Sequence, residues 1–235
     1  MKANPAEFTD AVRRGDRFLL LTHRRPDGDT IGSAAAICRG LRSLGKTVWV
    51  LENPDMTARY APFLEGLTVA APPEGATLFA VDVASESLLP ANAKPLAGQI
   101  ALCIDHHGSN TDYAATAWVE PGHAACGETV MELMDRLGVA ITAEMASALY
   151  LALSTDTGCF RYSNTTPATL RRAAALQEAG AETFAINRQF FPEACVAQAV
   201  AEGVERVVHL VEIVAGILAE LFCAFGHGRP VLRWL

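Results

Sequence analysis

The stretch of residues 18–36 constrains the fold of this chain more than any other part of its sequence. A short apolar run at 18–21 predicts a buried strand, and a tight turn that contains Pro26 and Gly28 follows it. From Thr30 onward, small and apolar residues recur at the spacing of a helix. A strand, a turn and a helix in this order predict one unit of an open α/β sheet, in which sites lie at such turns.

Three ionisable residues, His23, Asp27 and Asp29, lie on this turn. One imidazole and two carboxylates held so close together would repel and desolvate one another unless a cation lay between them. An Asp-x-Asp sequence in a loop is, taken alone, more often ordinary turn and capping chemistry. The prediction of a metal site therefore depends on His23 and on matching residues elsewhere in the chain.

Strands and helices continue to alternate through the first half of the chain. This alternation predicts an α/β fold with a doubly wound, mainly parallel five-stranded sheet flanked by helices, followed by a helical C-terminal segment. Residues 53–73 are expected to be irregular, with a short helix at 60–64. The predicted strands are 18–22, 47–51, 77–81, 99–104 and 115–119, and the predicted helices are 5–14, 30–44, 127–137, 142–155 and 166–180.

Composition narrows the class of protein. The 235 residues are 51% hydrophobic, which suffices for a full core, and the net charge of −7 argues against non-specific binding of duplex DNA. The most apolar window, 204–225, is interrupted by charges that would cost too much at bilayer depth, so no membrane segment is predicted. The six cysteines form no Cys-x-x-Cys pair and the N-terminus has no apolar signal, which indicates reduced thiols and a cytoplasmic protein.

Further acidic and imidazole groups match the first turn in their placement. Asp82 follows the third predicted strand, the Asp-His-His sequence at 105–107 follows the fourth, and Asp156 ends a helix. Because the carboxyl ends of parallel strands lie along one edge of a sheet, these groups can converge with Asp27 and Asp29. Two divalent cations would cancel the four aspartate charges. Carboxylate and imidazole ligands without a thiolate suit Mn²⁺ best, and Mg²⁺, Fe²⁺ or Co²⁺ less well.

The sequence resembles the DHH phosphoesterase family in four motifs. They are His-x-x-Pro-Asp-x-Asp-x-x-Gly-Ser at 23–33, the strand-end Asp82, Asp-His-His at 105–107 with Asn110, and Thr-Asp-Thr-Gly-x-Phe at 155–160. Within the family, the sequence is most similar to the bifunctional oligoribonucleases and PAP phosphatases, and the run at 160–167 adds to this likeness. Four motifs in the same order make a chance match improbable.

The resemblance implies two metal ions with separate ligands. His23 and Asp27 would hold one ion, and Asp29, His106 and Asp156 would hold the other. A further residue, Asp82, would bridge the two ions. Two Mn²⁺ ions are the implied cofactors.

The resemblance also implies roles for residues that hold no metal. His107 would face the scissile phosphate as a general acid or an electrostatic stabiliser. Asp105 would orient an imidazole, as metal-bound histidines usually require. Asn110 would contact the substrate, and Arg161 is a further candidate for this contact, for which a surface or helix-pairing role fits as well.

The implied activity is hydrolysis of short oligoribonucleotides from the 3′ end, which releases nucleoside 5′-monophosphates, and of 3′-phosphoadenosine 5′-phosphate. Two bound metal ions would activate the attacking water. The same ligands would also serve a relative that acts on cyclic dinucleotides or on inorganic pyrophosphate. A third interpretation is a catalytically weak, metal-binding remnant that acts as an interaction module.

Two parts of the chain are expected to differ in role. Residues 1–190 would form the catalytic domain, and residues 191–235 a helical segment. Family members of this kind have a second, C-terminal domain that binds substrate through a glycine-rich, histidine-containing segment, and nothing in residues 191–235 matches it. Substrate choice is therefore left open. An exposed apolar face on the C-terminal helices would favour self-association as a homodimer.

Overall fold

The computed structural model describes residues 4–192. The apolar C-terminal helices, and the self-association expected from them, lie outside these described residues. The chain up to Phe190 forms one compact unit, which contains every motif of the sequence analysis. Within residues 4–192, no helix combines the length and the apolar character needed to cross a membrane.

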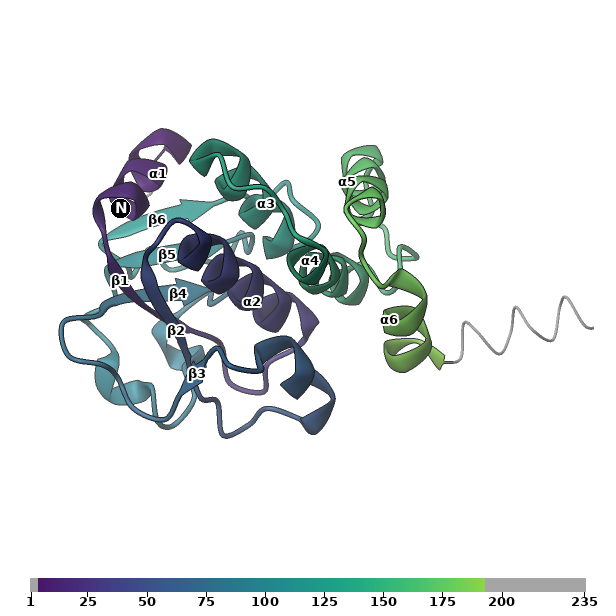
Figure 1. Cartoon of the computed structure of the whole chain (residues 1–235). Coiled ribbons are helices and arrows are strands. Elements are labelled where there is room, and N and C mark those ends of the chain that lie inside the picture. Colours follow the sequence, from purple (N-terminus) through teal and green to yellow (C-terminus); the bar gives the residue numbers. More distant parts are fainter. Residues whose placement is uncertain (1–3, 193–235) are drawn as a thin grey trace, which may run out of the picture. The chain divides into compact units, whose positions relative to one another are not determined.

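A parallel sheet forms the centre of this unit, with the strand order β3-β2-β1-β4-β5-β6 (Figure 1). The predicted α/β fold with a doubly wound, parallel sheet is thus confirmed, but the sheet has six strands and not five. The additional strand, β3, pairs with the edge of β2 through two residues, which is too short for any sequence periodicity to reveal. The strands are β1 (Arg17–Leu21), β2 (Thr47–Leu51), β3 (Thr68–Val69), β4 (Thr77–Val81), β5 (Leu102–Asp105) and β6 (Thr116–Val119).

The predicted helices match the structure to within two residues at either end, and one further helix, Thr183–Phe190, was not predicted. Helix α2 begins at Gly28, before the predicted start at Thr30, because the Asp27 side chain caps it by accepting hydrogen bonds from the Asp29 and Thr30 backbone amides. The α-helices are α1 (Pro5–Arg14), α2 (Gly28–Ser43), α3 (Cys126–Leu137), α4 (Ala143–Asp156), α5 (Pro167–Glu178) and α6 (Thr183–Phe190). The 3₁₀ helices of the described part of the chain are η1 (Ala58–Leu64), η2 (Glu86–Leu88) and η3 (Lys94–Leu96).

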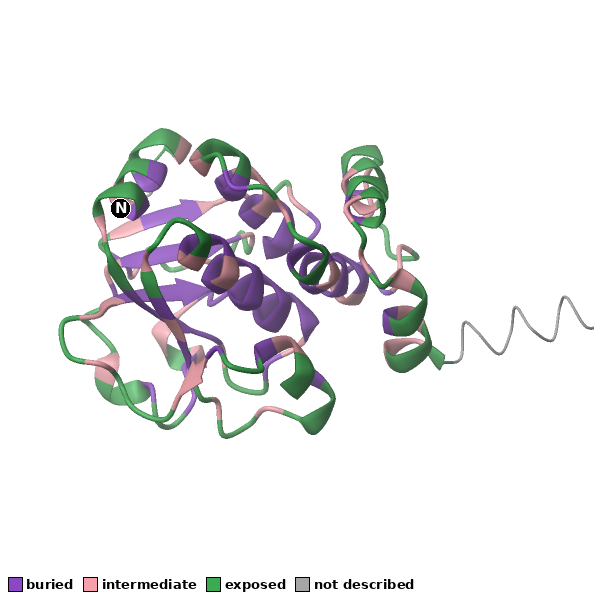
Figure 2. Ribbon diagram, viewed as in Figure 1, coloured by how far each residue is buried: buried purple, intermediate pink, exposed green. Residues whose placement is uncertain are grey.

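The two faces of the sheet are covered differently. Alternate residues of β1 point to opposite faces, so that Phe18 and Leu20 join the core under helices α1 to α4. Leu19 and Leu21 join a smaller core on the other face, together with residues from the segment that carries η2 and η3. Helices α2 and α4 are largely buried, whereas α5 is mostly exposed (Figure 2).

Helices α2 and α4 approach each other closely at Gly32. A Cβ atom at this position would lie 2.1 Å from the backbone oxygen of Ala148, far inside van der Waals contact. The contact is to backbone, so no side-chain rotation can relieve it. Glycine at 32 therefore permits the packing that brings the start of α2 and the end of α4 together.

Gly32→Ala is expected to destabilise the protein by about 3 kcal/mol, because the added methyl group forces the two helices apart. Thermal unfolding should show a fall in Tm of about 6–12 °C. Gly122→Ala is the matched control, since a Cβ there meets no atom within 4 Å. An equal Tm for both variants would contradict the packing described for α2 and α4.

Candidate metal centre

The candidate site lies at the point where the strand order reverses. Strands β1 and β4 are neighbours in the sheet, and the chain leaves them toward opposite edges. His23 follows β1, Asp82 follows β4, and His106 follows β5, so all three lie at the carboxyl edge of the sheet. Open α/β sheets bind ligands in the crevice at such a point.

One set of converging side chains, here named the His23 group, consists of His23, Asp27 and Asp82. One ligand atom from each lies within 4.8 Å of the others. The His23 Nε2 atom is 3.5 Å from Asp27 Oδ1 and 3.7 Å from Asp82 Oδ2. These spacings leave room for an ion between the atoms, while they are too long for strong hydrogen bonds.

A second set, here named the Asp156 group, consists of Asp29, His106 and Asp156. The His106 Nε2 atom lies 3.6 Å from Asp29 Oδ2 and 3.2 Å from Asp156 Oδ2. Helix α2 supplies Asp29 from its first turn, and helix α4 supplies Asp156 from its last residue. The close approach of these helices at Gly32 therefore assembles this group.

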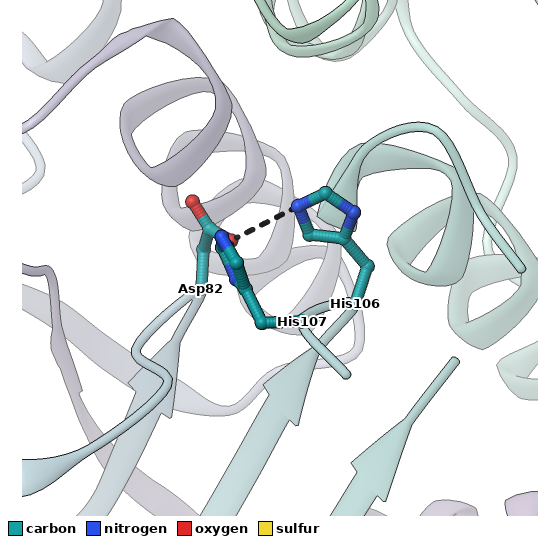
Figure 3. Close-up of side chains that lie close together, drawn as sticks. All are labelled: Asp82, His106 and His107. Carbon is teal, nitrogen blue, oxygen red and sulfur yellow. Dashed lines mark ion pairs between the residues drawn. The ribbon is translucent and has the colours of Figure 1, made fainter. Parts of the chain in front are cut away.

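Asp82 lies between the two groups. While Oδ2 faces His23, Oδ1 is 3.7 Å from His106 Nε2 and 3.4 Å from His107 Nδ1. Figure 3 shows the two imidazoles beside this carboxylate, with dashed lines for the ion pairs. Asp82 has a left-handed backbone with φ 60°, an uncommon conformation for a residue other than glycine that is often found at functional sites.

The chemistry of the donor atoms fits a divalent cation. The Nδ1 atoms of His23 and His106 donate to the backbone oxygens of Arg24 and His123, so each Nε2 presents a lone pair to the site. Within residues 4–192, His106 Nε2 and Asp82 Oδ1 are buried and have no hydrogen-bond partner. Buried polar atoms are rarely left in this state, and a cation would satisfy both.

The backbone around the site holds the carboxylates in place. Asp29 is fully buried and accepts hydrogen bonds from the backbone amides of Cys126 and Gly127, at 2.6 and 2.9 Å. These amides belong to the first turn of α3, where the helix dipole favours a negative charge. Ser33 adds a third hydrogen bond, from Oγ to Asp29 Oδ1 at 3.1 Å.

Asp105 organises the loop that carries the two histidines. Its Oδ1 accepts hydrogen bonds from the backbone amides of His106 and His107 and from His107 Nδ1, the last at 2.8 Å. Its Oδ2 accepts a hydrogen bond of 2.6 Å from Asn110 Nδ2. Burial acts to raise the pKa of Asp105, but these hydrogen bonds outweigh it and hold the pKa below its usual value. The imidazole that Asp105 contacts directly is that of His107.

Burial and mutual repulsion shift the acidities of the other groups. Burial raises the pKa of Asp29 well above its usual value, and the charge of Asp156 adds to the shift. The pKa of Asp82 is raised in the same way, by burial first and then by the charges of Asp29 and Asp27. For His106, burial acts to lower the pKa, yet the nearby carboxylates of Asp156 and Asp29 raise it to about 9.

These shifts predict that the metal-free protein holds protons at the site near neutral pH and releases them when a cation binds. A cation needs the unprotonated forms of Asp29, Asp82 and His106, whose pKa values are all raised. Apparent metal affinity should therefore increase with pH up to about 9. Calorimetric titration with Mn²⁺ in buffers of different ionisation enthalpy measures the proton release. A heat of binding that is the same in every buffer would contradict this assignment.

Several supporting residues carry no signal in the sequence. The His123 carbonyl, which orients His106, and the amides of Cys126 and Gly127 act through backbone atoms, so their side chains do not reveal them. Asn164 lies in the 160–167 run and bridges the backbone oxygens of Ala124 and Asp156 through Nδ2.

Arg161, a predicted substrate contact, lies five residues after Asp156 in the chain. It is exposed and its Nε donates to the Gly158 oxygen at 2.7 Å. Gly158, Cys159 and Phe160 between them have φ values of 56°, 57° and 63°. Three successive left-handed residues, two of them not glycine, indicate a backbone that the surrounding structure constrains strongly.

Comparisons with known proteins agree with this architecture. A family model described as the DHH family, N-terminal domain, matches residues 17–153. The bifunctional oligoribonuclease and PAP phosphatase NrnA of Thermus thermophilus is 41% identical over 159 residues, which cover 67% of this chain and 48% of that protein. The protein of the same name from Bacillus subtilis is 27% identical over 175 residues, covering 72% of this chain and 55% of that one.

A solved structure is similar as well. The crystal structure of an exopolyphosphatase-related protein from Bacteroides fragilis matches with a TM-score of 0.67 and 25% identity, over 80% of this chain and 60% of that one. The chain spans about half the length of the curated relatives that it matches. The family match covers more than half of the chain and includes His23, Asp82 and His106. The chain therefore belongs to the DHH family and matches its N-terminal domain.

Proposed function

We propose that this chain is a manganese-dependent phosphoesterase that hydrolyses short oligoribonucleotides and 3′-phosphoadenosine 5′-phosphate, with residues 1–190 as its catalytic domain. The observation that carries the proposal is Asp82, a buried carboxylate that faces His23 with one oxygen and His106 with the other. The names of the relatives from Thermus thermophilus and Bacillus subtilis support both substrates.

Two ions fit the residues present. The His23 group would hold one ion and the Asp156 group the other, with Asp82 shared between them. When bound, such a pair of ions activates water and neutralises charge on the phosphoryl oxygens. Oxygen and imidazole ligands without a thiolate favour Mn²⁺, and would also accept Mg²⁺, Fe²⁺ or Co²⁺.

His107 is proposed to supply the proton for the leaving group. Its side chain is 45% exposed, so it can reach a substrate, whereas that of His106 is 11% exposed. Asp105 accepts the hydrogen bond from His107 Nδ1, which fixes the orientation of the ring. Nε2 can then carry a proton toward the departing ribose 3′-oxygen, which belongs to the shortened oligonucleotide or to adenosine 5′-monophosphate.

Arg161 and Asn110 remain proposed substrate contacts, with different support. Only Nε of Arg161 has a hydrogen bond among the described residues, which leaves the other guanidinium nitrogens available for a phosphate. The Asn110 amide already donates to Asp105, so its nearest role is to hold the carboxylate that orients His107.

An assay with purified protein and Mn²⁺ tests the proposal. The substrates are a diribonucleotide, 3′-phosphoadenosine 5′-phosphate, a cyclic dinucleotide and inorganic pyrophosphate, and the expected result is turnover of the first two. Turnover of only the cyclic dinucleotide or pyrophosphate would indicate that the same metal centre serves another class of substrate. Tight Mn²⁺ binding with no turnover on any of the four would refute the enzyme and favour a metal-binding interaction module.

A further inference from the structure

A network of charged side chains lies beside the metal centre without belonging to either ligand group. Arg172, on α5, forms ion pairs with Glu128 and Glu132, which lie on α3. Its Nη2 is 2.5 Å from Glu132 Oε1 and 3.4 Å from His123 Nε2. One guanidinium thus contacts three side chains of the segment 123–132.

Glu128 is the buried member of this network and depends on Arg172. The residue is 1% exposed, and a carboxylate so far from water needs a positive partner. Arg172 is the only cationic side chain paired with it among residues 4–192. A buried pair of this kind adds little net stability, so its effect here is to fix the position of α3 relative to α5.

His123 connects the network to the metal centre. Its ring lies between Arg172 and Thr129, with Nε2 accepting from the guanidinium and Nδ1 donating to Thr129 Oγ1 at 2.9 Å. Glu132 Oε1 also lies 3.3 Å from Nε2. The backbone oxygen of His123 accepts a hydrogen bond from His106 Nδ1, at 3.2 Å. Holding the His123 ring therefore holds the carbonyl that orients a proposed metal ligand.

The other end of the segment contacts the Asp156 group as well. Glu128, which pairs with Arg172, directly follows the two residues whose amides bind the Asp29 carboxylate. The segment thus positions both His106 and Asp29, while the His23 group makes no hydrogen bond or ion pair with it among the described residues.

We propose that Arg172 is a positioning residue for the Asp156 group. Arg172 sets the affinity of the cation held by that group and leaves the affinity of the cation held by the His23 group unchanged. The inference rests on the proposed metal centre. In this proposal, α5 holds the segment 123–132 in place through Arg172, and that segment orients His106 Nε2 and Asp29 toward the proposed ion. A purely structural ion pair would alter both ion sites equally or neither.

Arg172→Met tests this inference, with Arg171→Met as the matched control. Arg171 is adjacent on the same helix, is exposed, and makes no described hydrogen bond or ion pair. Calorimetric titration with Mn²⁺ should show one ion bound 10–100-fold more weakly in Arg172→Met, and the other with its wild-type affinity. Electron paramagnetic resonance at two equivalents of Mn²⁺ should show uncoupled Mn²⁺ where the wild type shows a spin-coupled pair.

A second variant guards against misfolding. In Arg172→Met, Glu128 is left as an unpaired buried charge, so the double variant Arg172→Met/Glu128→Gln removes the charge together with its partner. The same selective 10–100-fold weakening in this variant supports the inference. A folded double variant with both affinities unchanged, or with both weakened equally, would overturn it. A wild type that binds fewer than two Mn²⁺ ions would instead refute the metal centre on which both proposals stand.

Discussion

Asp82→Ala is expected to abolish binding of two metal ions and to lower kcat/KM by at least about a thousandfold. Both proposed ions lose a carboxylate oxygen at once, because Asp82 Oδ1 faces His106 and Oδ2 faces His23. Metal ions contribute several kcal/mol to stabilisation of a phosphoryl transition state, and each 1.36 kcal/mol corresponds to a factor of ten in rate. Metal analysis after gel filtration measures the loading, and a diribonucleotide assay measures the rate.

Asp82→Asn separates loss of the metal from loss of the fold. Asparagine has nearly the same shape and tolerates the left-handed φ of 60° at this position. Its neutral amide is a poor bridge between two cations, so metal loading and activity should fall as they do in Asp82→Ala. Two ions per chain in either variant would refute the bridging role of Asp82.

The same substitution should make the metal-free protein more stable near pH 8. The pKa of Asp82 is raised above its usual 3.8, so whatever stability this group contributes is present below that pH and is lost as the pH rises through the raised pKa. Above its usual pKa, the burial of this carboxyl group therefore opposes folding, and Asp82→Asn removes that cost. The expected gain is about 1 kcal/mol, or about 2–4 °C in Tm, measured in the presence of EDTA.

His107→Ala is expected to lower kcat by about 10²–10⁴-fold while two ions remain bound. His107 lies close to Asp82 and His106 but outside the His23 group and the Asp156 group, and its Nδ1 is held by Asp105 at 2.8 Å. The variant therefore loses a proton donor and keeps the ligands of both proposed ions. Ser109→Ala, an exposed change in the same loop, should retain wild-type activity.

The leaving group distinguishes proton donation from other roles of His107. A ribonucleotide oxygen needs a proton as it departs, whereas p-nitrophenolate leaves without one, so His107→Ala should hydrolyse a p-nitrophenyl phosphodiester with less than about a tenfold loss. Equal losses on both kinds of substrate would indicate that His107 acts through electrostatic stabilisation of the phosphate. A fall in metal content would instead make it a ligand, as its 3.4 Å distance from Asp82 Oδ1 allows.

Much of the fold was predictable because it depends on local periodicity. The apolar runs at 18–22, 47–51 and 77–81 predicted β1, β2 and β4 to within one residue at either end. The start of β5 was predicted at Gln99, but the strand begins at Leu102, since Gln99 is still bonded to η3 through the Leu96 oxygen. The two-residue β3 exists only because β2 offers it an edge, and no local pattern encodes that.

The candidate site divides in the same way. Aspartates and histidines follow several successive strands, so their placement indicated where a site would lie before any contact was known. The network of Arg172, Glu128 and His123 was not predicted, because its members lie 44 and 49 residues apart in the chain and match no motif.

By itself, the sequence determined the parallel α/β fold and the residues that reach the carboxyl edge of the sheet, because both follow from short-range patterns of apolar and ionisable side chains. Only the tertiary structure decided how those residues are oriented. Asp82 faces two histidines, the His123 carbonyl accepts a hydrogen bond from His106, and the amides of α3 donate to Asp29. Each of these contacts depends on backbone atoms that are brought together by the close packing of α2 and α4 at Gly32 and by the pairing of strands. Backbone atoms are the same in every residue, so their contacts leave no mark on the sequence.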